Sequence, residues 1–120
     1  MSDAGVQAGD GALLERWLNA MWVEKGLSDN SLTDYRGDLR GFCRWLAQRG
    51  RVLDKVTRDD IKAFLDFLHE QKRDPRTAAR YLSALRGFYK WAKREGLVEI
   101  NPTLQVMRPR QGRTLPKILS

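Results

Sequence analysis

The stretch from Asp74 to Arg94 constrains the fold of this 120-residue chain more than any other. Its opening Asp-Pro pair supplies an N-cap and a proline at the first helical position, which together favour a helix start. At about 100° per residue the apolar side chains fall on one stripe, which comprises Ala78, Tyr81, Leu82, Leu85, Phe88, Tyr89 and Ala92. The sequence therefore predicts a helix that is buried along one side and ends near Gly96.

The other side of this predicted helix is cationic. It carries Arg76, Arg80, Ser83, Gly87, Lys90 and Arg94, with Arg86 and Lys93 at its edges. Solvated helix faces usually mix positive and negative side chains, because like charges four residues apart repel. Residues 72–94 instead contain eight cations and one acid, the N-cap Asp74. This pattern favours an anionic partner, and a rod with a row of cations suits the major groove and phosphates of duplex DNA.

Three further helices are predicted upstream. They cover residues 12–25, residues 28–48 and a segment that begins at Thr57, with Asp10, Ser28 and Thr57 as N-caps and Gly26 and Gly50 as stops. Their apolar stripes are Leu14, Trp17, Leu18, Met21 and Trp22, then Leu32, Tyr35, Leu39, Phe42, Cys43 and Leu46, then Ile61, Phe64, Leu65 and Leu68. Trp45 and Trp91 lie off the centres of their stripes, which makes them candidates for exposed contact residues.

These elements predict an all-α, four-helix domain over residues 12–107, with short connections. We expect residues 1–11 to form a flexible N-terminus and residues 108–120 to form a linker toward an absent further domain. An apolar turn around Leu104, Val106 and Met107 is expected to pack back on the bundle.

The charge is unevenly distributed along the chain. The net charge is +7 and the isoelectric point is about 10.0. Residues 1–34 carry two basic and six acidic side chains, whereas residues 71–100 carry eight basic and three acidic ones. The single cysteine, Cys43, fits a buried thiol in a reducing compartment. Neither a secretory signal nor a membrane span is apparent, so a cytoplasmic location is expected.

Residue sets typical of catalysis or metal binding are missing from the sequence. The single histidine, His69, reads as a surface or helix-end residue, and there is no Cys-x-x-Cys or phosphate-binding glycine motif. The adjacent acids Asp59 and Asp60 fall in the first turn of a predicted helix, where capping and the helix dipole account for them. We therefore assign no catalytic residue, no metal ligand and no cofactor.

Two segments and a short tail resemble the N-terminal part of bacterial tyrosine recombinases, of the phage integrase family. They are LNAMWVEKGLSDNSLTDYRGDLRGFCRWL, RTAARYLSALRGFYKWAKREGLVEINP and RTLPKILS. The resemblance covers about residues 12–120 and is strongest to members that resolve chromosome dimers at a dif-like site. It implies a four-helix core-binding domain with a SAM-like fold, whose second and fourth helices lie in the DNA major groove.

The resemblance, together with the charge pattern, gives the candidate DNA-binding residues. They are Asn30, Ser31, Thr33, Arg36 and Arg40 in the second helix, Arg76, Thr77, Arg80, Ser83, Arg86, Lys90 and Arg94 in the fourth, and Arg113 and Lys117 in the linker. In this family the full-length protein cuts and rejoins strands through a phosphotyrosine link without a cofactor, paired with a partner recombinase in a heterotetrameric synapse. The tyrosine and its Arg, Lys and His activators belong to a catalytic domain that this chain lacks, so it is expected to bind DNA without cleaving it.

One departure and one rival interpretation remain. Gly37 and Gly41 dilute the second helix and are expected to soften its fit to DNA. The rival is a helical protein–protein module whose basic helix docks on an acidic partner, with the first helix, acidic at Glu15 and Glu24 where the fourth is basic, as its principal contact surface.

Overall fold

The computed structural model describes residues 7–71 and 74–104, and these form four α-helices and one short 3-10 helix. The elements are α1 (Ala8–Lys25), α2 (Asp29–Gln48), η1 (Leu53–Lys55), α3 (Arg58–Glu70) and α4 (Pro75–Arg94). The predicted all-α class is confirmed. None of the helices in the described residues is long and apolar enough to cross a membrane.

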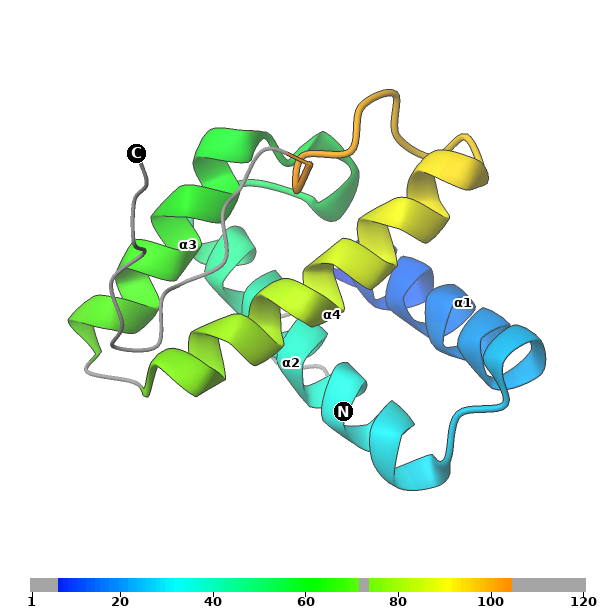
Figure 1. Ribbon diagram of the computed structural model, residues 1–120. Helices are drawn as coiled ribbons and strands as arrows, with labels where there is room; N and C mark the ends of the chain where they lie inside the picture. The colour runs from blue at the N-terminus through cyan, green and yellow to red at the C-terminus, as the bar shows by residue number, and fades with distance from the viewer. Residues whose placement is uncertain (1–6, 72–73, 105–120) are drawn as a thin grey trace, which may run out of the picture.

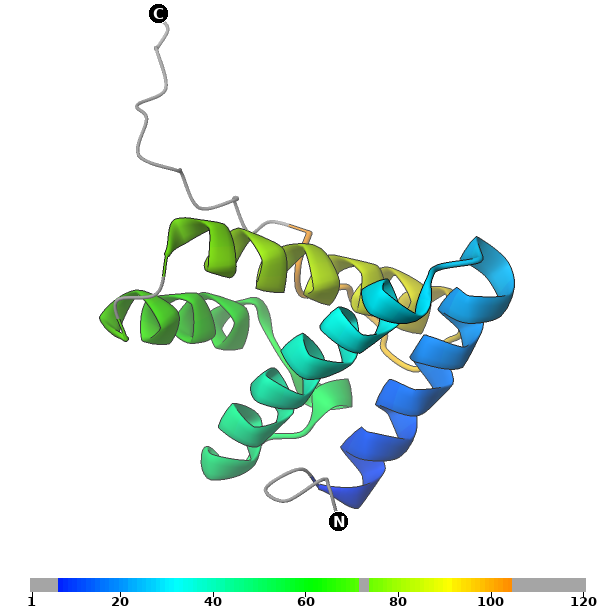
Figure 2. The same ribbon diagram turned by 90° about the horizontal axis from the view of Figure 1, so that it is seen from below.

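Helix α4 lies across the other three helices (Figures 1 and 2). Helix α4 crosses the middle of α2. The N-terminal half of α4 runs beside α3, and its C-terminal half approaches the end of α1. The first turns of α2 reach the same side of the molecule as α4 (Figure 2). This arrangement places the first turns of α2 and the whole of α4, the two helices that the family resemblance singles out, on one side.

Aromatic side chains fill the space where the helices cross. Phe64 of α3 meets Phe42 of α2 at 4.9 Å and Tyr81 of α4 at 5.3 Å between ring centroids, in edge-to-face geometry. Trp17 of α1 meets Phe88 of α4 at 5.8 Å. Each such side chain contributes about 1.5–3 kcal/mol by leaving water, so this core dominates the stability.

The predicted N-caps of α2, α3 and α4 are confirmed. The Ser28 hydroxyl accepts from the N–H of Ser31 at 3.2 Å, and the Asp74 carboxylate accepts from the N–H of Arg76 at 2.7 Å. Thr57 and Asp60 form the full capping box, each side chain accepting from the other residue's N–H. These bonds satisfy donors that a helix start leaves without partners.

The prediction for the start of α1 is wrong. The helix begins at Ala8 rather than at residue 12, so Asp10 lies inside its first turn. Asp10 is buried there and accepts a hydrogen bond from the N–H of Leu53 at 3.0 Å. Burial raises the pKa of this carboxyl group. A partner 43 residues away gives the acid a role that the local sequence does not reveal.

Three tryptophans lie differently from their predicted positions. Trp45 and Trp91 are buried, because Phe42 and Phe64 pack on the first and Phe88 on the second. Trp22 was expected in the core, yet it is 52% exposed near the end of α1. Leu104 is also exposed, which contradicts its predicted packing, and Val106 and Met107 lie outside the described residues.

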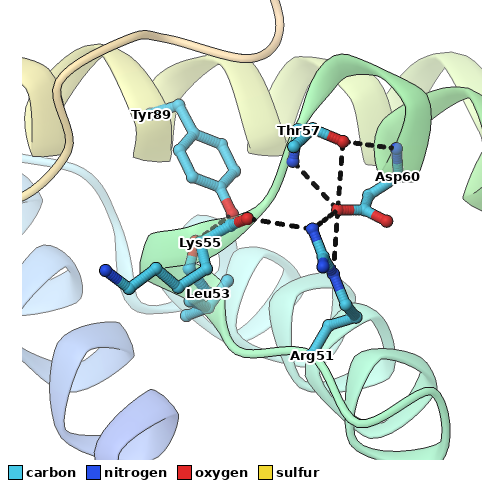
Figure 3. A network of polar contacts seen from close by, with 6 residues as sticks. All are labelled: Arg51, Leu53, Lys55, Thr57, Asp60 and Tyr89. Carbon is cyan, nitrogen blue, oxygen red and sulfur yellow. Dashed lines mark hydrogen bonds and ion pairs between the residues drawn. The ribbon is translucent and has the colours of Figure 1, made fainter.

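A polar network fixes the connection between α2 and α3 against α4 (Figure 3). The Tyr89 hydroxyl donates to the carbonyl of Leu53 at 2.7 Å, and Arg51 donates to the carbonyl of Lys55 at 3.1 Å and to Asp60 at 2.7 Å. Burial alone would raise the pKa of Asp60, but the Thr57 N–H and the Arg51 guanidinium outweigh it and lower that pKa. The connection is therefore held by side chains from both of its ends and from α4.

Candidate nucleic-acid interface

The solvent side of α4 and the first turns of α2 form the candidate interface. Its exposed side chains are Asn30 of α2 and Arg76, Arg80, Ser83, Lys90 and Arg94 of α4, while Ser31, Thr77 and Arg86 are half-buried. Thr33 is exposed as well, but on another side of α2. The first turns of α2, which carry hydroxyl and amide residues, lie on the same side of the molecule as α4 (Figures 1 and 2). Such a mixture of charge and hydrogen-bonding groups is what DNA phosphates and base edges require.

Arg80 is bound to α2 where the two helices cross. Its Nε and Nη2 atoms donate to the two carboxylate oxygens of Asp38 at 3.0 and 2.8 Å. The hydrogen bond that Arg80 donates to Asp38 raises the pKa of Arg80, which therefore stays charged. The Asp38 side chain is 4% exposed and the Arg80 side chain is 55% exposed, so the acid lies beneath the arginine.

Gly41 lies at the same crossing. A Cβ atom at this position would come within 3.1 Å of the Tyr81 hydroxyl, whereas one at Gly37 would meet nothing within 4 Å. Gly41 therefore permits the close approach of α2 and α4. The sequence-based expectation that it merely weakens the helix misses this role.

Helix α1 occupies one edge of the cationic face of α4. Arg94 donates to both carboxylate oxygens of Glu24, at 3.0 and 2.9 Å, and this hydrogen bonding raises the pKa of Arg94. Gly87 lies against Trp17, which an added Cβ would meet at 3.5 Å. The C-terminal half of the predicted cationic row is therefore partly covered and partly neutralised.

Arg36 and Arg40 reach α1 as well. Arg36 forms a two-bond contact with Glu15 at 3.1 and 3.0 Å, and Arg40 lies 3.9 Å from the same carboxylate. Both arginines lie about 160° around α2 from Asp38, since two residues turn a helix by about 200°. Thr33 lies about 140° from Asp38, on the same side of α2 as Arg40. The structure thus does not bring these three candidates together with Arg80.

Fewer cations are left to bind an external anion than the sequence indicates. Within residues 7–71 and 74–104, no ion pair involves the side chains of Arg76, Lys90 or Lys93. The two remaining candidates, Arg113 and Lys117, lie outside the described residues. We therefore regard Arg76 and Lys90 as the principal candidates on α4 for direct contact with DNA.

A groove of about 770 Å³ lies apart from these residues, between η1, the start of α3 and the chain after α4. Charged and apolar side chains line it, including Lys55, Arg58 and Ile100. It contains none of the candidate DNA-binding residues, so Lys55 is a cation outside the interface.

Comparison with known proteins identifies the family. The model of the phage integrase N-terminal SAM-like domain matches residues 14–96, from α1 to the end of α4. The chain belongs to this family. No solved structure matches it.

The chain is similar to curated proteins named tyrosine recombinase XerD. It is 48% identical to the protein of Pseudomonas aeruginosa over 90% of this chain and 36% of the relative. It is 47% identical to that of Pseudomonas putida over 92% of this chain and 37% of the relative, and 39% identical to that of Shewanella oneidensis over 90% and 36%. The chain therefore spans little more than a third of the length of these relatives.

Proposed function

We propose that this domain binds duplex DNA site-specifically through α2 and α4, as the core-binding part of a XerD-like tyrosine recombinase. The observation that carries the proposal is that the first turns of α2 lie on the same side of the molecule as α4 (Figure 2), with Asn30 of α2 and Arg76 and Lys90 of α4 exposed to solvent. Family membership supports it. The rest of the full-length protein would cut and rejoin strands at a dif-like site through phosphotyrosine.

Different side chains would contribute affinity and selectivity. Lysine is a flexible point charge that suits phosphates, so Lys90 is assigned to the DNA backbone. A guanidinium can donate two bonds to a guanine edge, which is worth about 1–3 kcal/mol of discrimination. Arg80 and Arg76 are assigned to this task, because both are exposed and lie one helical turn apart.

The proposal also places the domain in an assembly. In the cytoplasm, a XerC-like recombinase would occupy the other half of the site, and two such pairs would form the synapse that resolves chromosome dimers before cell division. The domain itself would contribute DNA binding to this assembly. Asn30 and Ser31 of α2 would face the groove beside α4.

A salt titration tests the proposal. Binding is measured by the fluorescence anisotropy of a labelled duplex at several salt concentrations. We expect the logarithm of the association constant to fall linearly with the logarithm of the salt concentration, with a slope of about −3 to −5 for three to five phosphate contacts. A flat response would contradict DNA binding. Size measurements with and without the duplex separate the rival interpretation, because assembly with an acidic protein in the absence of DNA would favour a protein–protein module.

A further inference from the structure

A buried acid beneath a proposed DNA-binding surface calls for an explanation. Asp38 is 3% exposed, and its carboxylate lies directly under Arg80 at the crossing of α2 and α4. Its negative charge opposes the attraction of the face for phosphates. Asp38 therefore has a role other than increasing the affinity of this face for DNA.

The geometry of the Asp38–Arg80 pair indicates this role. A guanidinium has five N–H groups in a rigid plane, and Asp38 accepts from two of them, on Nε and Nη2. The other three N–H groups remain, and the Arg80 side chain is 55% exposed. The two-bond contact therefore fixes the plane of the guanidinium while leaving donors for a further acceptor.

The surroundings restrict the pair further. Gly41 lets α2 approach the ring of Tyr81, and that ring lies 5.8 Å from the Arg80 guanidinium carbon. Asp38 is carried by a helix interior and buried, so it has little freedom to follow a moving arginine. Arg94, in contrast, pairs with Glu24 where both side chains are well exposed.

We propose that Asp38 is a positioning residue, which holds the Arg80 guanidinium in one orientation to read a base edge and lowers non-specific attraction to DNA. The inference rests on the proposed function. An arginine fixed before binding loses less conformational freedom on contact, which favours the base it fits. Removing the acid should therefore weaken selective binding and strengthen unselective binding.

The test compares Asp38→Asn with Glu24→Gln. Both variants remove one negative charge that faces an arginine of α4, but only the first releases an arginine held by a buried acid. The probes are a duplex selected by the wild-type domain from a random-sequence pool and a scrambled duplex of the same composition. We expect Asp38→Asn to reduce the ratio of selected to scrambled affinity about tenfold or more, with affinity for scrambled DNA equal or higher. Glu24→Gln should leave the ratio unchanged.

Arg80→Lys is a second test, which can be carried out whether or not the Asp38→Asn variant folds. It keeps the charge and a partner for Asp38 but lacks the planar fork, so it should lower the same ratio. An unchanged ratio in Arg80→Lys, or in a folded Asp38→Asn domain, would overturn the proposal. If the wild-type domain binds neither duplex, the proposed function itself fails, which is a distinct result.

Discussion

At the scale of single residues, one oxygen of Asp60 accepts hydrogen bonds from the Thr57 N–H at 2.9 Å and from Arg51 at 2.7 Å. The carboxylate thereby caps α3 and ties it to the end of α2. Neutralising it removes the charged acceptor from these part-buried hydrogen bonds. We expect Asp60→Asn to lower the free energy of unfolding by about 1–3 kcal/mol at neutral pH, measured by urea denaturation.

The pH dependence of this effect follows from the lowered pKa of Asp60. An acid whose pKa is lower in the folded state adds stability above its unfolded value of about 3.9, and that stability is lost as the pH falls through the folded pKa. The difference between wild type and Asp60→Asn should therefore shrink in strong acid. Asp59→Asn, at the exposed neighbouring position, is the control, and a difference independent of pH would argue against the account.

At the scale of helices, Gly37 and Gly41 of α2 form a matched pair. Alanine favours a helix interior by about 0.8–1.0 kcal/mol over glycine, so Gly37→Ala should raise the free energy of unfolding by about this amount. Gly41→Ala should gain less or lose stability, because its Cβ comes within 3.1 Å of the Tyr81 hydroxyl. Thermal or urea unfolding of both variants checks this, and equal stabilisation would mean that α2 and α4 are not closely packed there.

The helices themselves were largely predictable, because their signals are local. Ser28, Thr57 and Asp74 cap nearby N–H groups, and the apolar stripe of α4 matches its buried side. The errors arose where distant segments meet. Trp91 is buried because Phe88 and Arg16 surround its ring, and Arg16 lies on another helix.

At the scale of the whole molecule, the difference between local signals and contacts between distant segments explains how much of the site was predictable. The cations of α4 were recognised because their spacing is local. Their partners are remote, since Asp38 lies 42 residues from Arg80 and Glu24 lies 70 residues from Arg94. Intramolecular acids thus account for part of a charge pattern that the sequence attributed to an external partner alone.

The central claim is that the exposed face of α4 binds DNA phosphates. Lys90→Ala and Lys55→Ala each remove one exposed lysine, the first from this face and the second from the groove beside η1. In the salt titration, Lys90→Ala should weaken binding and reduce the magnitude of the slope by about 1, whereas Lys55→Ala should leave the slope unchanged. Equal changes in the two variants would contradict the assignment of this face.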